Sequence, residues 1–408
     1  MDHYRAISAL IDSYFEQETE FLQQLVRIPS NNPYTADTAP PDAAVEKQIA
    51  ACIYRRMQDL GFSPTFHGVT PERPNVLATI EGADQSGKTL ILTTHMDTVE
   101  PSSGYTCDPF GAVIEDGKMF GLGVADAKAQ IAAFLYAVYA VRQAGLRLKG
   151  HVKLAFVVDE EAGACSPYGT RYLLEQGLLR GDAAIVGEPG DRKIATGHRG
   201  VYRFHLRTFG ETVHTGLKEW EMGAKGHNAA VDMASLSLAL ARFQIPYMPS
   251  ASFPGRRPVL TFPTLVSAGK TINMVPDRCD AYGEIRLLPG ITEEEIRRHL
   301  TQCLDETGIS YTLETVAYVP AAEIPLDAEV VRVLSASIEA ITGKTLRREG
   351  AGPACDGWQF MAHGIPAVCG YGVACSGVHG ADEWASLSSL HEVTKVYAHM
   401  LVEYLGII

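Results

Sequence analysis

Three patterns are missing from this sequence, and each absence argues against a class of protein. There is no excess of basic residues: 35 lysines and arginines face 48 aspartates and glutamates, for a formal net charge of −13. A nucleic-acid-binding surface needs a basic patch, so we expect no nucleic-acid partner. There is also no run of about 18 apolar residues, so we expect no transmembrane helix. The N-terminus lacks the basic flank and apolar core of a signal peptide. We therefore expect no membrane partner.

Closely spaced cysteine pairs are missing too. The eight cysteines are scattered along the chain, and none of them forms a Cys-x-x-Cys pair. This distribution is typical of buried free thiols in a reducing compartment. It does not favour a disulfide framework or a zinc site made of thiolates. We therefore expect a cytoplasmic protein.

The composition that is present is ordinary for a globular protein of about two domains. The chain has 408 residues, of which 46% are hydrophobic and 20% are charged. Domains usually have roughly 150 residues, and such a composition can bury a sizeable core. Function must therefore be sought in local patterns.

The segment from Leu90 to Asp97 carries the first such pattern. Residues 90–94 are leucine, isoleucine and threonine, which predicts a strand buried on both faces. The strand ends in His95 and Asp97, which point the same way because strand side chains alternate with period 2. Ligands bind at the carboxyl ends of strands in an open parallel sheet. A histidine and an aspartate can also simply occupy the turn after a strand. Whether they belong to a binding site therefore depends on how the other strands end.

Two further predicted strands end in acidic residues. The strand at 152–158 is followed by Glu160 and Glu161, and the strand at 183–186 is followed by Glu188. If these strands are parallel neighbours, their carboxyl ends meet at one edge of the sheet. The repetition favours a site over three unrelated turns.

Asp126 begins the next predicted helix, at 127–144. Two glycines precede it, Gly121 and Gly123, and invite a dinucleotide-binding interpretation. The third glycine of that motif is missing, and a carboxylate in its place would repel a pyrophosphate. An aspartate there can also be a plain N-cap. Together with the residues at the strand ends, Asp126 makes six ionisable groups at one edge of the sheet. Five of the six are acidic, and carboxylates this close together require a cation.

From residue 194 the order of the predicted elements changes. Strands are predicted at 201–207, 259–266, 278–287 and 311–318, with helices at 227–243 and 292–307. This β-α-β-β-α-β order is that of a ferredoxin-like unit, and the remainder belongs with the first sheet. The predicted fold class is α/β: a mixed, mostly parallel sheet flanked by helices, with an inserted ferredoxin-like α+β domain. The catalytic domain is expected at 1–193 and 320–408, and the insertion at 194–319.

The types of ligand indicate the cation. Imidazole and several carboxylates suit Zn²⁺ or another first-row divalent ion better than Ca²⁺ or Mg²⁺. The ligands are too many for one tetrahedral ion, and they suit two ions about 3.5–4 Å apart with a bridging carboxylate. A second histidine is needed, and His379 in the glycine-rich segment 377–383 offers it.

Five ordered motifs then resemble one family over nearly the whole chain. The motifs are Thr94-His95-Met96-Asp97-Thr98-Val99, Gly121-x-Gly123-x-x-Asp126-x-Lys128, Asp159-Glu160-Glu161, Gly187-Glu188-Pro189 and His379-x-x-Asp382-Glu383. Together they resemble the di-zinc aminoacylase and carboxypeptidase family. That family includes acetylornithine deacetylase, succinyl-diaminopimelate desuccinylase, aminoacylase and carboxypeptidase G.

The resemblance implies a set of metal ligands. One zinc ion would be held by His95 and Glu188, the other by Glu161 and His379, and both by a bridging Asp126. In the family, the peptide bond after the bridging aspartate is often cis.

The resemblance also implies two supporting roles. Glu160 would be the general base that acts on the water between the ions. Asp97 would take the second ring nitrogen of His95 and fix its tautomer.

The inserted domain resembles the family's lid domain. His214 matches a histidine that reaches across a dimer as an oxyanion donor, and Asn273 matches an asparagine that contacts substrate. Arg286 matches an arginine whose planar fork clamps a substrate carboxylate. The alternatives are that His214 is a plain surface histidine and that Arg286 forms a strand-end salt bridge. A homodimer is expected from the resemblance alone.

The predicted function is hydrolysis of the amide bond of an N-acyl amino acid. The cofactors would be two divalent ions, zinc in the first place, with cobalt or manganese as alternatives. A metallo-carboxypeptidase or dipeptidase that acts on a short peptide is the first alternative, because the core motifs are shared. A non-catalytic metal-dependent binding or scaffold protein is the alternative of another class. Loss of Glu160 or of a ligand would mark that class, and every expected group is present.

Overall fold

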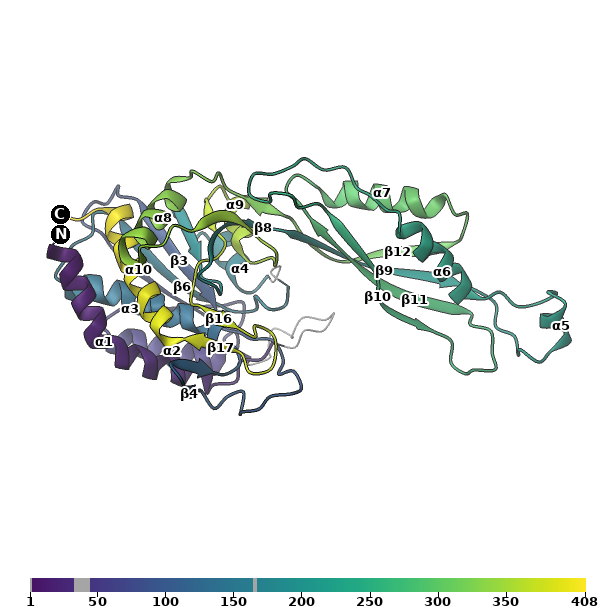
Figure 1. The fold of residues 1–408 in the computed structure, drawn as a ribbon, viewed down its shortest axis with the longest axis horizontal. Helices are drawn as coiled ribbons and strands as arrows, with labels where there is room; N and C mark the ends of the chain where they lie inside the picture. Colours follow the sequence, from purple (N-terminus) through teal and green to yellow (C-terminus); the bar gives the residue numbers. More distant parts are fainter. Residues whose placement is uncertain (1, 33–44, 164–166) are drawn as a thin grey trace. The chain divides into compact units, whose positions relative to one another are not determined.

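The structure is a computed structural model and describes residues 2–32, 45–163 and 167–408. The chain divides into two compact units, Met1–His198 with Glu323–Ile408 and Arg199–Ala322 (Figure 1). The insertion thus begins and ends a few residues later than the expected 194–319. The insertion begins later than expected because β8 (Lys193–His198) pairs in parallel with β14 (Arg347–Ala351) and so belongs to the first unit.

The first unit is built around a six-stranded sheet in the order β1-β2-β6-β3-β7-β15. Its strands are β1 (Thr65–His67), β2 (Asn75–Ile80), β6 (His151–Val157), β3 (Thr89–His95), β7 (Ala183–Val186) and β15 (Ala367–Val368). The last four in this order are parallel to one another, and β1 and β2 pair antiparallel at one side. The predicted mixed, mostly parallel sheet is confirmed.

Helices cover both faces of this sheet, which explains the uninterrupted apolar sequence of β3. Leu90 and Leu92 face the larger core, and Ile91 faces a smaller core on the other side. The larger core packs against α1 (Asp2–Val26), α2 (Lys47–Asp59), α3 (Ala129–Gln143), α8 (Glu329–Thr342) and α10 (Leu387–Leu405). The smaller core packs against α4 (Thr170–Glu175) and α9 (Gly357–Ala362).

Helix α3 continues from a wide turn, η1 (Val124–Lys128), that contains Asp126. The combined segment Val124–Gln143 is long and apolar enough to cross a membrane by length and composition, yet almost all of it is buried inside the first unit. A helix that is apolar all round is expected where neighbours cover every side, and α1 and α10 both pack against α3. This helix therefore forms the centre of the core.

Two small sheets complete the first unit. One has the order β13-β8-β14, with β13 at Ala322–Glu323, and the other has the order β16-β17-β5-β4. The strands of the latter are β16 (Cys375–Ser376), β17 (Trp384–Ser386), β5 (Lys118–Phe120) and β4 (Val113–Glu115). Through β17 and β5, the chain around His379 is tied to the chain just before Asp126. Residues far apart in sequence are thereby brought to one place.

The second unit is a four-stranded antiparallel sheet in the order β10-β11-β9-β12. Its strands are β9 (Gly200–Phe209), β10 (Val259–Ala268), β11 (Arg278–Leu287) and β12 (Tyr311–Val319), and its helices are α5 (Lys218–Glu221), α6 (Ala229–Leu240) and α7 (Glu293–Asp305). Thr292 and Glu295 cap α7 reciprocally, in a capping box. The chain order β-α-β-β-α-β confirms the ferredoxin-like prediction, with the short α5 as an addition.

Candidate metal centre

The predicted ligands meet at the carboxyl edge of the main sheet. His95 is the last residue of β3, Glu160 and Glu161 follow β6, and Glu188 follows β7. Because β6, β3 and β7 are parallel neighbours, their ends lie side by side and their side chains converge above the sheet. The structure therefore brings the predicted strand-end residues together at one edge.

Asp126 lies between two groups of ligands. Its Oδ1 is 3.1 Å from His95 Nε2, and its Oδ2 is 3.1 Å from His379 Nε2. His379 Nε2 also lies 3.2 Å from Glu161 Oε1. One set of potential ligand atoms comes from His95, Asp126 and Glu188 and the other from Asp126, Glu161 and His379, each set lying within 4.8 Å. A carboxylate that presents one oxygen to each group is what a bridge between two ions requires.

The charges at this edge fit a pair of divalent ions. Burial raises the pKa of Glu160 and Glu188 well above the usual range and also raises that of Glu161, and neighbouring carboxylates add to each shift. Glu188 Oε1 is buried and has no hydrogen-bond partner among the described residues. Carboxylates crowded in this way are costly without a counter-charge. Two divalent cations would supply that charge.

The neighbouring carboxylates favour the protonated form of both histidines. Burial alone would lower the pKa of His95, but the hydrogen bond to Asp126 and the charges of the nearby carboxylates raise it well above its usual value. Hydrogen bonds to Asp126 and Glu161 raise the pKa of His379 to about 10. A metal ion binds neutral imidazole, so binding would release these protons and replace their charge.

Glu383 holds the turn that carries Asp126, a role that the sequence did not reveal. Its two carboxylate oxygens accept the main-chain N–H groups of Gly123 at 2.9 Å, Ala125 at 2.8 Å and Asp126 at 3.1 Å. The peptide bond between Asp126 and Ala127 is cis, as the resemblance implied. Glu383 is adjacent to Asp382 in the last motif, and that position was the only signal for it.

The expected contact between Asp97 and His95 needs a correction. His95 Nδ1 lies 2.9 Å from the main-chain oxygen of Asp97, whereas the carboxylate Oδ1 is 3.6 Å away. The carboxylate instead accepts the main-chain N–H groups of Glu160 at 3.2 Å and Glu161 at 3.0 Å. After the strand end the chain turns, and its carbonyl is closer to the ring than the side chain is. Asp97 therefore orients His95 through its main chain and the two glutamates through its carboxylate.

A buried polar network behind Asp97 was also missed. Asn32 Nδ2 lies 2.9 Å from Asp97 Oδ2 and 2.6 Å from Asp159 Oδ1. Arg73 pairs with Asp159 at 2.9 Å and with Glu46, and all of these side chains are buried. The charged and amide groups of such a network hold one another in place in the core. This one fixes the backbone that leads into Glu160.

Comparisons with known proteins agree with this geometry. Residues 91–403 match the model of Peptidase family M20/M25/M40. The chain belongs to this family. It is 27% identical over 93% of its length to succinyl-diaminopimelate desuccinylase of Rhodospirillum centenum, covering 95% of that protein. It is 25% identical over 90% of its length to N-formyl-4-amino-5-aminomethyl-2-methylpyrimidine deformylase of Bacillus subtilis, covering 91% of it.

Solved structures show the same fold. An M20 family metallo-carboxypeptidase from Sulfolobus solfataricus superposes with a TM-score of 0.78 at 18% identity, with 95% of this chain and 99% of that one covered. The resemblance inferred from the five motifs is thereby confirmed. As a member of the M20 family with a clustered set of metal ligands, the chain is a metal-dependent hydrolase of amide bonds.

The remaining predicted site residues of this M20 hydrolase lie in the second unit. The Asn273 amide nitrogen is 3.2 Å from His214 Nε2, and Thr215 N donates to the Asn273 carbonyl at 3.0 Å. Arg286 Nε donates to Glu284 at 2.6 Å and is about one-third exposed. The structure thus pairs His214 with Asn273, and it places Arg286 in a salt bridge at the end of β11.

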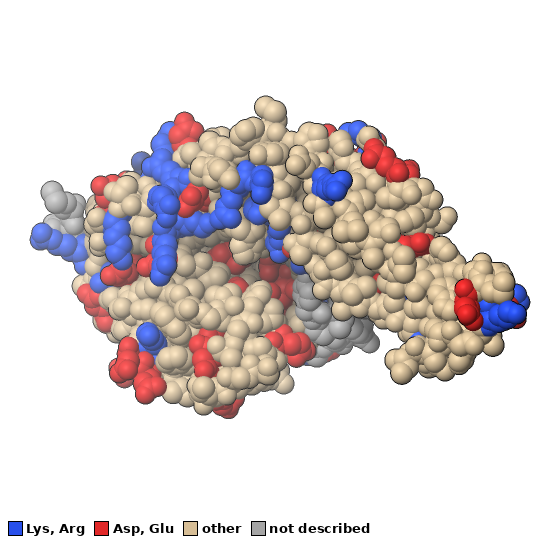
Figure 2. Space-filling model, turned by 45° about the vertical axis from the view of Figure 1, so that its right-hand side comes forward, with Lys and Arg blue, Asp and Glu red and all other residues tan. Residues whose placement is uncertain are grey.

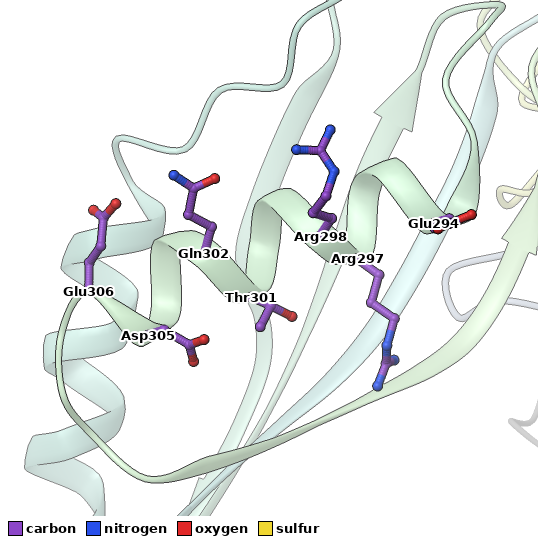
Figure 3. Close-up of a pocket in the computed structure, with 7 residues that line it drawn as sticks. All are labelled: Glu294, Arg297, Arg298, Thr301, Gln302, Asp305 and Glu306. Carbon is purple, nitrogen blue, oxygen red and sulfur yellow. The ribbon is translucent and has the colours of Figure 1, made fainter.

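A separate hollow lies along the outer face of α7 (Figure 3). It is lined by seven side chains from one helix, namely Glu294, Arg297, Arg298, Thr301, Gln302, Asp305 and Glu306. They point to opposite sides of the helix (Figure 3), and their mixed charges are typical of a solvated helix face. None of the predicted site residues lines it.

Proposed function

We propose that this M20 hydrolase removes the acyl group of an N-acyl amino acid by means of two divalent ions. The observation that carries the proposal is the bridging position of Asp126, with one oxygen 3.1 Å from each histidine. The names of both curated relatives describe the removal of an acyl group, succinyl in one and formyl in the other. That agreement favours a deacylase over a peptidase.

Two ions fit the five ligands as two sites that share a carboxylate. His95 and Glu188 would hold one ion, Glu161 and His379 the other, with Asp126 common to both. Imidazole with carboxylates suits Zn²⁺, and Co²⁺ or Mn²⁺ are the alternatives. When bound, the ions would supply Lewis acidity to the amide carbonyl and to a water molecule.

Glu160 is the proposed general base. It lies in the loop after β6 and is buried beside the ligand Glu161, and the Asp97 carboxylate accepts the main-chain N–H groups of both glutamates. Glu160 would take a proton from the attacking water and pass it to the leaving nitrogen, as a positioned carboxylate does in general acid–base catalysis. This transfer turns a poor leaving amide nitrogen into an amine.

The second unit would supply the groups that recognise substrate. Gly216 N–H donates to His214 Nδ1 at 3.0 Å and helps to hold the ring. A protonated Nε2 would be the donor that a developing oxyanion needs, once substrate displaces the Asn273 amide nitrogen that lies 3.2 Å from it. Asn273 orients this ring, and Arg286 would exchange its bond to Glu284 for the carboxylate of the substrate.

We further propose a homodimer in which His214 serves the partner's metal centre. Helix α6 exposes Val231, Ala234, Ser235 and Leu238, spaced three or four residues apart, which is one helix face. The edge strand β10 exposes Leu265 and Val266. The second unit, at the right of Figure 2, is mostly uncharged in that view. Exposed apolar surface of this kind is typical of an interface, and it supports pairing of two copies through this unit.

The second candidate is a metallo-carboxypeptidase or dipeptidase that cleaves a short peptide. The similar Sulfolobus solfataricus structure, which bears the name of a metallo-carboxypeptidase, favours it. The same metal centre and the same Arg286 would serve either substrate. The two functions differ only in the group on the carbonyl side of the cleaved bond, which is a simple acyl group in one and an aminoacyl group in the other.

A substrate panel separates them. The full-length protein is assayed against N-acetyl, N-formyl and N-succinyl amino acids and against dipeptides, with and without a chelator, and then with Zn²⁺, Co²⁺ or Mn²⁺ restored. We expect chelator-sensitive turnover that is highest for an N-acyl amino acid. Highest turnover of a dipeptide would support the second candidate, and turnover that a chelator leaves unchanged would contradict the metal mechanism.

A further inference from the structure

Three side chains that can bind a metal converge behind the carboxylate centre. His198 is the last residue of β8, Cys355 lies between β14 and α9, and Cys369 directly follows β15. Their ligand atoms all lie within 4.8 Å of one another. Their exposed fractions are 0%, 4% and 2%, so the group lies fully inside the first unit.

Main-chain hydrogen bonds bring these residues together. β14 runs parallel to β8 with Ala351 opposite His198, which places the segment leading to Cys355 beside the end of β8. Cys369 N donates to Ala195 O of β8 at 2.7 Å, and Ala195 N donates to Gly370 O at 2.8 Å. The positions of all three residues are therefore set by the backbone of the fold.

The loop at Gly357 is shaped around the two sulfur atoms. The neighbouring Cys369 and burial raise the pKa of the Cys355 thiol, whereas Gly357 N–H, which donates to its Sγ at 3.4 Å, lowers this pKa and so favours the thiolate. A Cβ atom at position 357 would lie 2.3 Å from Cys369 Sγ, so the glycine leaves room for the second sulfur. Amide donors to sulfur support metal-bound thiolates from the second shell of ligands.

We propose that Cys355, Cys369 and His198 form a third metal site, which binds one Zn²⁺ or another thiophilic divalent ion. In a tetrahedral zinc site, sulfur and nitrogen ligands are about 3.5–3.8 Å from one another, which fits a group within 4.8 Å. The three side chains fill three of four positions, and a water molecule takes the fourth. The site is distinct from the carboxylate centre, whose five ligands contain no sulfur.

Charge balance favours an ion at this depth. On binding, each thiol gives up its proton to solvent, and two thiolates with a neutral imidazole then exactly offset a divalent cation. Without an ion both sulfurs stay protonated and donate weakly to main-chain oxygens, Cys355 to Cys369 O and Cys369 to Ala367 O, each at 3.8 Å. A neutral complex is the form that a buried site tolerates.

The ion would fix the segment that supports Glu188. Gly370, next to Cys369, packs so closely on Glu188 that a Cβ there would lie 3.1 Å from Glu188 Cβ. The ion would link β8, the loop before α9 and the end of β15. It would therefore stabilise the segment that packs against Glu188. The proposal does not depend on the reaction that the carboxylate centre performs.

The competing explanation is that the two cysteines only fill the core. Both belong to the smaller core with Phe360 and Ile365, and free cysteine often behaves as a small apolar residue. A core role predicts that neither sulfur ever contacts a metal. The spectrum of bound cobalt distinguishes the two explanations.

The test is titration of the reduced, metal-stripped full-length protein with Co²⁺. A thiolate ligand gives an intense sulfur-to-cobalt charge-transfer band in the near ultraviolet, which nitrogen and oxygen ligands cannot give. We expect this band in the wild type, with three ions bound per chain. Cys355→Ser and Cys369→Ser should lose the band and one ion and keep the other two.

Cys375→Ser is the matched control, because Cys375 is also partly buried and lies in the small sheet near the carboxylate centre. It should keep the band and all three ions. If the reduced wild type binds Co²⁺ at the carboxylate centre without any charge-transfer band, the third site does not exist. The wild-type spectrum alone decides this, even where a serine variant fails to fold.

Discussion

The carboxylate of Asp97 accepts the main-chain N–H of Glu161 at 3.0 Å, although Asp97 follows β3 and Glu161 follows β6. A second oxygen accepts the N–H of Glu160 at 3.2 Å. The ends of two neighbouring strands are thus joined by one buried side chain. The proposed base and a proposed ligand depend on it for their backbone positions, and His95 depends on the Asp97 carbonyl.

Replacing Asp97 by asparagine should therefore weaken both the metal centre and catalysis. Asparagine keeps one acceptor oxygen but turns an NH₂ group toward the N–H donors of Glu160 or Glu161. Loss of such a supporting partner typically costs 10–100-fold in metal affinity or activity, so we expect a loss of about that size. Elemental analysis after dialysis and the hydrolysis rate measure it.

The control for Asp97→Asn is Asp84→Asn, since Asp84 is exposed and its carboxylate accepts the N–H and the hydroxyl of Ser86, away from the metal centre. It should behave as the wild type. Wild-type metal content together with a wild-type rate in Asp97→Asn would show that the carboxylate is not needed to position the strand ends.

Glu160→Gln and Glu161→Gln should fail in different ways, although the residues are adjacent. Glu160→Gln should keep both ions and lose roughly 10²–10⁴-fold in rate, which is the usual contribution of general acid–base catalysis. Glu161→Gln should lower the metal content first, because it weakens the set of Glu161, Asp126 and His379. Metal analysis and steady-state rates on the same samples separate the two.

Each variant serves as the control for the other, since both replace a buried carboxylate by the same amide. A fully active Glu160→Gln variant would show that Glu160 is not the general base. A Glu161→Gln variant that retains both ions at full affinity would show that Glu161 is not a metal ligand.

The residues of the candidate site could be predicted to lie together because their main signal was local. A buried strand followed by His95, another followed by Glu160 and a third followed by Glu188 can each be recognised in a few residues. Parallel pairing then brings them together without further information. The ferredoxin-like unit was predictable for the same reason, since the order of its strands and helices fixes its class.

The residues that sequence missed act across long separations. Asn32 reaches Asp97 and Asp159, and Glu383 reaches the turn at Asp126, so their partners lie far along the chain. The proposed third metal site depends in the same way on the pairing of β8 with β14. Cysteine spacing argued against a thiolate site because such motifs describe neighbours in sequence, whereas these ligands are neighbours only in the folded sheet.

Glu18 should make stability depend on pH, away from the metal centre. It is fully buried between α1 and α10, where it accepts the Thr394 hydroxyl at 2.5 Å, and burial raises its pKa to about 8. Between pH 4.5 and 8 the unfolded chain releases this proton while the folded chain keeps it. Stability should therefore be greatest below the unfolded pKa, fall as pH rises through this window, and level off above it.

Glu18→Gln removes this titratable carboxyl group, so the stability of the variant should fall less as the pH rises. The variant should match the wild type near pH 5 and exceed it near pH 8 by up to a few kcal/mol, since one pKa unit corresponds to about 1.4 kcal/mol. Urea unfolding across this range measures the difference, and the exposed Glu16→Gln should show none. An equal gap between Glu18→Gln and the wild type at every pH would mean that Glu18 does not titrate in this window.

Mixed dimers test whether His214 acts on the partner's metal centre. His214→Ala and Glu160→Gln should each be nearly inactive as pure dimers. In a mixed dimer, the chain with intact Glu160 receives intact His214 from its partner, so one of two centres is complete. Random exchange at equal concentrations makes about half of the dimers mixed, and about a quarter of the wild-type rate should return.

The exchange itself must be measured for this outcome to be decisive. Native mass spectrometry of differently tagged chains would report the fraction of mixed dimers. Asn273 supports the ring of His214 from the same chain, so Asn273→Ala mixed with Glu160→Gln should also restore activity. If mixed dimers form and the rate stays at that of the single variants, His214 acts within its own chain, and the exposed face of α6 does not serve to share an active site.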